Sequence, residues 1–97
     1  MTDDKPPSRR VIWSDRSRRD LENIRAYIGQ FKPLAAQRFT ARLVATVESL
    51  ADYPHRGRVV SPQVRELTTV APYLVRYRVT ANAVQVVWIK HGARQPE

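Results

Sequence analysis

After a short β-branched run at residues 10–14, the chain changes its hydrophobic period once, close to Pro54 and Gly57. Before that point apolar residues recur every three or four positions, and after it they alternate with polar residues in short β-branched runs. The first spacing is typical of an amphipathic helix, and the second is typical of a strand with one buried face. The sequence therefore predicts a helical half followed by a sheet half, which is the pattern of an α+β fold.

The helical half contains two amphipathic segments. Ser14 or Asp15 can cap the first helix, Gly29 loosens its end, and Pro33 suits the first turn of the second. Each helix has one apolar face: Leu21, Ile24, Ile28 and Phe31 in the first, and Ala36, Phe39, Leu43, Val47 and Leu50 in the second. The short connector predicts that the two helices are antiparallel, and both need an apolar surface to cover.

Four segments are predicted to be strands, one before the helices and three after them. They cover residues 10–14, which we expect at a sheet edge, and residues 64–70, 73–80 and 83–91. Pro62 is expected to keep the stretch between Gly57 and Val64 irregular. Connections of hairpin length make the last three strands antiparallel. The predicted fold is β-α-α-β-β-β, with two antiparallel helices on one face of a small, mainly antiparallel sheet.

Length and composition limit the possible classes of protein. A chain of 97 residues supports one core, so we expect a single domain over residues 9–97 and a flexible arm over residues 1–8. The absence of cysteine excludes disulfides and thiolate metal sites. No apolar stretch approaches the roughly 20 residues of a membrane span, so we expect no membrane partner and a cytoplasmic location.

Basic residues dominate the sheet half of the sequence. The net charge is +8, and seven Arg or Lys residues follow Asp52, whereas Glu66 is the only carboxylate between Asp52 and Glu97. Such a charge favours an anionic partner: nucleic acid, an acidic protein or an anionic membrane surface. Arg76 and Arg78 share one face of their strand by the period of two. That face is either an ordinary solvated surface or an anion-binding surface, and Glu66 is expected to pair with a neighbouring cation.

Candidates for catalysis are few. His91 ends the last strand beside Lys90, where a solvent-facing imidazole could transfer protons, although a single histidine at a strand end is more often structural. Asp20 and Glu22 diverge on their helix and are interpreted as surface charges. Two isolated histidines provide no metal-ligand spacing. We therefore expect no catalytic residues, no metal and no cofactor.

Several short segments together resemble the RelE/ParE superfamily of bacterial toxins from type II toxin-antitoxin modules, and its ParE branch in particular. The resemblance spans residues 10 to about 94 and rests on the order and spacing of its pieces. These are Val11-Ile-Trp-Ser14, Asp20-Leu-Glu-Asn-Ile24, Ala35-Ala36, Arg38-Phe39, Leu50-Ala-Asp-Tyr-Pro54, Gly57-Arg58, Arg65-Glu-Leu67, Pro72-Tyr73, Tyr77-Arg-Val79 and His91-Gly-Ala-Arg94.

The resemblance implies a small toxin that an antitoxin holds inactive by wrapping it with a flexible acidic segment. ParE-like members poison DNA gyrase, and RelE-like members cleave messenger RNA on the ribosome. The nuclease branch typically uses a sheet-borne arginine, a C-terminal His and Tyr, and sometimes a loop glutamate. Here the arginine position is Leu74, Gly92 follows His91 in place of Tyr, and the loop glutamate is missing.

The resemblance favours a gyrase-poisoning toxin that acts by binding and that a ParD-like antitoxin neutralises in a hetero-oligomer. One alternative is a ribosome-dependent endoribonuclease that uses Arg65, Arg76 and His91. Another is a non-toxic domain that only binds an antitoxin. The residues expected to contact the antitoxin or the target are Arg58, Arg65, Arg76, Arg78, Lys90, His91 and Arg94.

Overall fold

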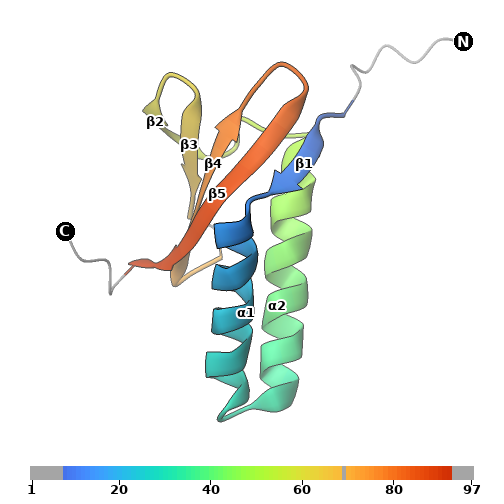
Figure 1. Cartoon of the computed structure of the whole chain (residues 1–97), viewed down its shortest axis with the longest axis vertical. Helices are drawn as coiled ribbons and strands as arrows, with labels where there is room; N and C mark the ends of the chain where they lie inside the picture. The colour runs from blue at the N-terminus through green and yellow to red at the C-terminus, as the bar shows by residue number, and fades with distance from the viewer. Residues whose placement is uncertain (1–7, 69, 93–97) are drawn as a thin grey trace, which may run out of the picture.

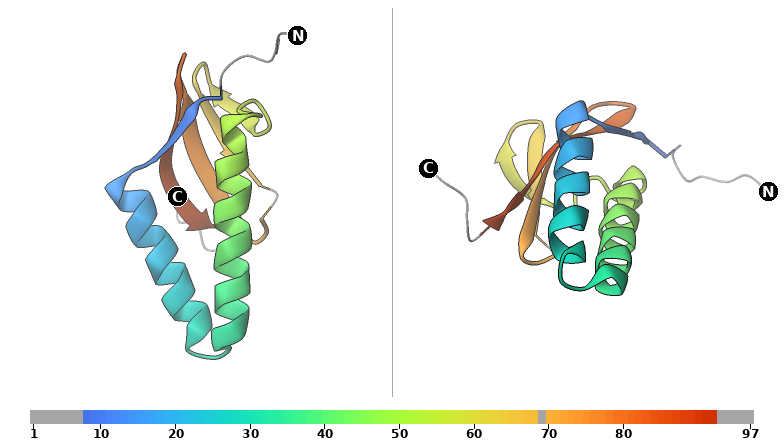
Figure 2. Two further views of the ribbon diagram at one scale, coloured as in Figure 1. Left: turned by 90° about the vertical axis from the view of Figure 1, so that its right-hand side faces the viewer. Right: turned by 60° about the horizontal axis from the view of Figure 1, so that its bottom comes forward.

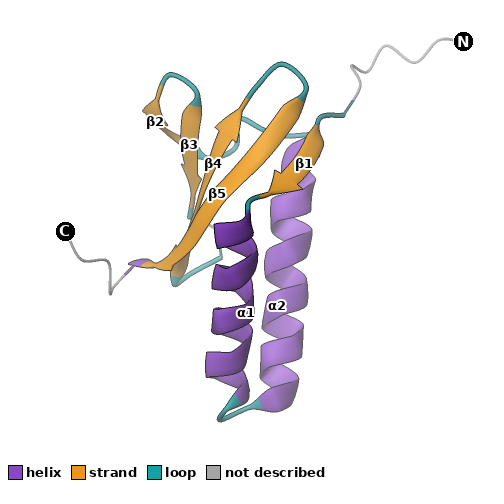
Figure 3. Cartoon of the chain, viewed as in Figure 1, coloured by secondary structure: helices purple, strands orange, loops and turns teal. Residues whose placement is uncertain are grey.

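Two antiparallel helices lie against one face of a five-stranded sheet in the computed structural model, which describes residues 8–68 and 70–92 (Figure 1). Figure 3 separates the helices from the strands by colour. The elements are β1 (Arg10–Trp13), α1 (Asp15–Gly29), α2 (Pro33–Glu48), the 3-10 helix η1 (Ser49–Ala51), β2 (Arg58–Ser61), β3 (Val64–Leu67), β4 (Tyr73–Val79) and β5 (Ala83–His91). The predicted α+β class is confirmed. The predicted flexible arm, apart from Ser8, lies outside the described residues.

The strands follow the order β1-β5-β4-β3-β2 across the sheet. β1 pairs with β5 in parallel, and the other three pairings are antiparallel. The prediction of an irregular stretch before Val64 is wrong, because β2 pairs with β3 there. All four residues of β2 are exposed, so this edge strand has no hydrophobic alternation by which the sequence could reveal it.

Ser14 fixes the start of α1 against the sheet. Its hydroxyl accepts a hydrogen bond from the Ser17 backbone N–H at 3.0 Å, as expected of a helix cap. The same hydroxyl donates to the Val87 carbonyl at 2.9 Å, and the Ser14 N–H donates to the Val86 carbonyl at 3.1 Å. The predicted cap is therefore confirmed, and it also connects α1 to β5.

The core lies between the helices and the sheet face that they cover, which we call the covered face. Leu43 and Val47 of α2 and Val75 and Tyr77 of β4 are 0% exposed. Tyr77 of β4 is in this core, and Tyr73 contacts Phe39 of α2 with the rings tilted and their centroids 5.5 Å apart. The apolar faces predicted for the two helices thus define most of the helix side of the core.

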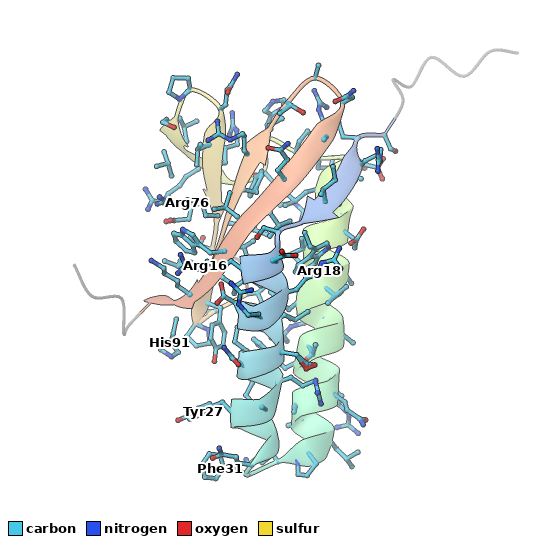
Figure 4. All side chains as sticks on the ribbon, viewed as in Figure 1. Arg16, Arg18, Tyr27, Phe31, Arg76 and His91 are labelled. Atoms are coloured by element: carbon cyan, nitrogen blue, oxygen red, sulfur yellow. The ribbon has the colours of Figure 1, made fainter. Side chains whose placement is uncertain are left out.

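The helical hairpin extends past the sheet (Figure 2). Phe31 was expected on the apolar face of the first helix, but α1 ends at Gly29 and Phe31 is 68% exposed. The expectation is wrong because the sheet does not reach this end of the hairpin. Phe31 contacts Tyr27 edge-on instead, with ring centroids 5.9 Å apart. Figure 4 shows both rings projecting from the hairpin, with Phe31 at the end away from the sheet.

Asp20 has a structural role that the sequence interpretation missed. Its carboxylate accepts a hydrogen bond of 3.0 Å from the Ile89 backbone N–H, beyond the point where β1 stops pairing with β5. Glu22 points elsewhere and pairs with Arg25. The two carboxylates diverge as expected, but only Glu22 is a plain surface charge. Of the helices in the described residues, none has the length and apolar character needed to cross a bilayer.

Candidate partner-binding face

The face of the sheet opposite the helices, which we call the open face, carries a row of polar and aromatic side chains across four strands. The strand register places Arg58 of β2 opposite Glu66 of β3, Glu66 opposite Arg76 of β4, and Arg76 opposite Trp88 of β5. Directly opposed residues in antiparallel strands share a face and come into contact. We call these four residues the cross-strand row.

Glu66 holds the two arginines of the row in place. One oxygen of its carboxylate accepts a hydrogen bond from Nη2 of Arg58, and the other accepts one from Nη2 of Arg76, each at 2.7 Å. The Glu66 side chain is 3% exposed, whereas Arg58 is 68% exposed and Arg76 is 32% exposed. The expectation that Glu66 pairs with a neighbouring cation is confirmed, and it pairs with two.

Trp88 supports the cations at the other end of the row. The guanidinium carbon of Arg76 lies 4.7 Å from the centre of the Trp88 ring, and Nζ of Lys90 lies 4.5 Å from it. Both distances are within the range of cation–π attraction. Trp88 itself is only 8% exposed. Its indole ring is therefore a buried support for two cations and presents little surface for stacking.

A β-bulge determines which side chains of β5 reach the open face. The register between β4 and β5 shifts between Arg76 and Tyr77, so Tyr77 pairs with Val86 while Arg76 pairs with Trp88. Val87 is the extra residue in β5. A bulge of this kind reverses the alternation of the strand beyond it. Trp88 and Lys90 consequently lie on the open face, although simple alternation would group them with Val86.

The same bulge turns His91 toward the helices. His91 pairs with Tyr73 and contacts its ring edge-on, with ring centroids 5.2 Å apart. The imidazole is half-buried on the covered face instead of facing solvent as predicted. It lines a hollow of about 330 Å³, together with Asp20 and Tyr27 of α1. Figure 4 shows His91 at the end of β5.

Arg65 lies on the covered face, opposite Tyr77 in the register of β3 and β4. Its guanidinium Nη1 donates to the backbone carbonyls of Gly57, at 2.7 Å, and His55, at 3.0 Å. Arg65 therefore fastens the loop that leads into β2. The three candidate nuclease residues are not brought together, because Arg76 is on the open face and Arg65 and His91 are opposite different residues of β4.

The loop before β2 is also fixed from inside the core. The Tyr77 hydroxyl donates to the Pro54 carbonyl at 2.8 Å and accepts from the Gly57 N–H at 2.8 Å. A Cβ on Gly57 would approach the Tyr77 oxygen to 2.7 Å and the Glu66 carbonyl oxygen to 2.8 Å, so only glycine fits. Burial raises the pKa of the Tyr77 phenol, and the hydrogen bond from Gly57 partly offsets this. These contacts hold β2, and with it Arg58, against β3.

The remaining candidates have separate surroundings. Arg78 is on the open face beside Val64, and its Nη1 donates to the Gln63 side chain at 3.3 Å. Arg94 lies outside the described residues. Within residues 8–68 and 70–92, no group of three or more His, Asp or Glu side chains is placed to hold a metal ion. Sequence reasoning found the cations of the row but missed Trp88, whose orientation depends on the bulge.

Comparisons with known proteins agree with this architecture. Residues 11–96 match the family model of the ParE toxin of type II toxin-antitoxin systems, parDE. A solved structure, the chromosomal ParDE toxin-antitoxin system from P. aeruginosa, superposes with a TM-score of 0.75 at 22% sequence identity. The match covers 87% of this chain and 96% of that chain. The fold is thus that of a small α+β toxin of the RelE/ParE class.

Two curated relatives extend the comparison. Toxin RelE2 of Caulobacter vibrioides is 51% identical over 84 residues, which is 87% of this chain and 96% of the relative. Toxin RelE1 of the same organism is 35% identical over 88 residues, covering 88% of this chain and 95% of the relative. The chain belongs to the ParE toxin family of type II toxin-antitoxin systems, within the RelE/ParE superfamily.

Proposed function

We propose that this chain is a toxin that acts by binding DNA gyrase and blocking replication, without chemistry of its own. The observation that carries the proposal is the separation of Arg65, Arg76 and His91. Arg76 is held by Glu66 and Trp88 on the open face, whereas Arg65 and His91 lie on the covered face. A catalytic set must converge on one reacting bond, and these residues do not.

The chemistry of RNA cleavage supports the same proposal. Attack by a ribose 2′-hydroxyl needs one group to remove its proton and another to protonate the leaving oxygen. His91 packs against Tyr73 on the covered face. Arg65 is engaged with two backbone carbonyls. This arrangement favours a binding surface over an acid-base pair.

An antitoxin is the proposed physiological partner. The P. aeruginosa neighbour of this fold is described as a chromosomal ParDE toxin-antitoxin system. The +8 net charge of the present chain suits a ParD-like antitoxin with an acidic segment. The proposal thus includes a toxin-antitoxin hetero-oligomer in the cytoplasm, where gyrase works.

A second candidate function is cleavage of messenger RNA on the ribosome. It is favoured by one specific observation, the name RelE given to the relatives that are 51% and 35% identical. In this alternative His91 acts from the hollow that it shares with Asp20 and Tyr27. The ribosome would have to supply the groups that the toxin lacks on that side of the sheet.

The two candidates differ in the role of His91. Purified toxin added to gyrase, ATP and relaxed plasmid should inhibit supercoiling or trap cleaved DNA, and expressing cells should form filaments. His91→Ala should keep most of this activity, because a binding surface seldom depends on one half-buried imidazole. The proposal would be refuted if the wild type cleaved messenger RNA on the ribosome and had no effect on gyrase. In that case His91→Ala should reduce the cleavage by about 10²-fold or more.

A further inference from the structure

We infer that the cross-strand row, together with Lys90, is a preorganised binding surface for the carboxylates of an acidic peptide, and that Glu66 is its positioning residue. The proposed toxin-antitoxin function suggests which acidic chain would bind, but the chemistry of the surface is argued from the row itself. The row and Lys90 together have three cations, Arg58, Arg76 and Lys90, and one carboxylate, Glu66. Their net charge of +2 (three minus one) remains available to a partner.

The row is rigid in a way that an ordinary solvated strand face is not. Free arginine and lysine side chains lose rotamer entropy when a partner fixes them. Here Glu66 already fixes one terminal nitrogen of Arg58 and one of Arg76 at 2.7 Å. Glu66 is 3% exposed, and each of its two oxygens accepts a hydrogen bond from one arginine. It therefore acts from beneath the surface. The entropic cost of binding an anion is therefore largely met on folding.

Trp88 adds a second restraint on the same cations. Arg76 and Lys90 lie over its ring at 4.7 and 4.5 Å from the centroid, which orients both toward one region of the sheet. The Nε atom of Arg76 is buried and has no hydrogen-bond partner among the described residues. Arg76 is thus held by Nη2 on one side and by the indole ring on the other, and its remaining terminal nitrogen can meet a further anion.

The chemistry of the row fits carboxylates better than nucleic acid. Single-stranded nucleic acids gain much of their affinity from bases stacked on exposed aromatic rings. Trp88 is 8% exposed beneath two cations, so the row offers little ring surface for a base. A guanidinium fork matches a carboxylate in shape and charge. Glu66 occupies only one terminal nitrogen of each arginine. A second copy of this chain is disfavoured as occupant, because both copies carry a net charge of +8.

Charge-preserving variants test the geometry of the row. Binding of fluorescein-labelled poly-L-glutamate is measured by anisotropy at low and physiological salt. The double variant Arg58→Lys with Arg76→Lys keeps the net charge but removes the planar forks, and it should bind about tenfold more weakly. The matched control is Arg18→Lys with Arg19→Lys, two exposed positions on α1, and it should bind as the wild type does. Equal loss in both double variants would overturn the inference.

Glu66→Gln separates positioning from simple charge. It raises the net charge by one, so general electrostatic attraction predicts tighter binding of poly-L-glutamate. The positioning role predicts the opposite, a loss of about three- to tenfold, because the amide NH2 cannot accept a hydrogen bond and the glutamine can hold only one of the two guanidinium groups. Circular dichroism confirms that each variant is folded at the assay temperature. Tighter binding by folded Glu66→Gln would overturn the role of Glu66.

Two further outcomes have a fixed meaning. In the first, poly-uridylate binds tightly through Arg58 and Arg76, and poly-L-glutamate binds no better to the wild type than to the lysine variant. This result would assign the row to nucleic acid and overturn the inference. The gyrase assay is read separately. Failure to inhibit gyrase would refute the proposed target but leave the peptide-binding result standing, whereas loss of the poly-L-glutamate effect alone would refute only the row.

Discussion

The two faces of the sheet use alternate residues of the same strand for different purposes. Along β4, Val75 and Tyr77 point to the covered face and are 0% exposed, whereas Arg76 between them points to the open face and is 32% exposed. On the covered face the contacts are apolar and close-packed, and on the open face they are ion pairs and cation–π contacts. One strand therefore carries both the main stabilising contacts and the candidate binding groups.

This difference indicates how the two faces respond to substitution. Burial of apolar surface is the dominant stabilising contribution in a small domain, so changes on the covered face should alter the free energy of unfolding strongly. Ion pairs with exposed partners contribute little to stability. Changes on the open face should instead alter binding.

Leu43→Ala should have the largest effect. Leu43 is 0% exposed at the centre of α2, and its truncation leaves a cavity that the packed core cannot close completely. We expect a loss of about 2 to 5 kcal/mol in the free energy of unfolding, measured by urea denaturation. A midpoint equal to that of the wild type would show that the helices do not pack on the sheet as described.

Tyr77→Phe should have an intermediate effect. The variant keeps the ring but loses the donation to Pro54 and the acceptance from Gly57. Leaving those buried backbone groups without their partner should cost about 1 to 3 kcal/mol of stability. Arg58 should also become more mobile, because β2 loses an anchor to the core.

Tyr77 also predicts a pH dependence. Burial raises the pKa of its phenol above the ordinary value of 10.0, so the unfolded chain releases this proton more readily than the folded chain. The resulting stabilisation is complete below pH 10.0 and is lost as the pH rises through the folded-state pKa. The difference in unfolding free energy between wild type and Tyr77→Phe should therefore shrink as the pH rises above 10.0. A difference that grows there would contradict the burial of the phenol.

Arg58→Ala should have the smallest effect on stability. Arg58 is 68% exposed, and Glu66 keeps its hydrogen bond to Arg76 when Arg58 is removed. We expect a change below about 1 kcal/mol in the free energy of unfolding, together with weaker binding of acidic peptide. A destabilisation as large as that of Leu43→Ala would erase the contrast between the faces.

The sequence predicted the covered face well because its signal is local. Hydrophobic spacing places Leu43 and Val47 on one side of α2, and strict alternation places Tyr77 and Arg76 on opposite sides of β4. Two predictions failed for different reasons. β2 consists of exposed residues and gave no hydrophobic signal. Phe31 follows the helical period, but it lies where the sheet does not reach.

The open face was predictable only in part. The cations and the single carboxylate Glu66 are evident in the sequence, but their grouping into one row requires the register of four strands. The bulge at Val87 reverses the alternation of β5 and exchanges the faces of Trp88 and His91. No residue type in Val84-Gln-Val-Val-Trp-Ile89 marks that bulge. The sequence analysis, which had no sign of the bulge, consequently considered a solvent-facing imidazole at His91.

The two tryptophans allow a direct test of the division between the faces. Trp13 lies on the covered face, where its indole N–H donates to Glu48 of α2 at 2.9 Å, and Trp88 lies in the cross-strand row. The measurement is the ¹⁹F NMR spectrum of toxin labelled with 5-fluorotryptophan, assigned with Trp13→Phe and titrated with poly-L-glutamate. The Trp88 resonance should shift with the ligand while the Trp13 resonance stays in place. A shift of Trp13 with an unchanged Trp88 would contradict the assignment of binding to the open face.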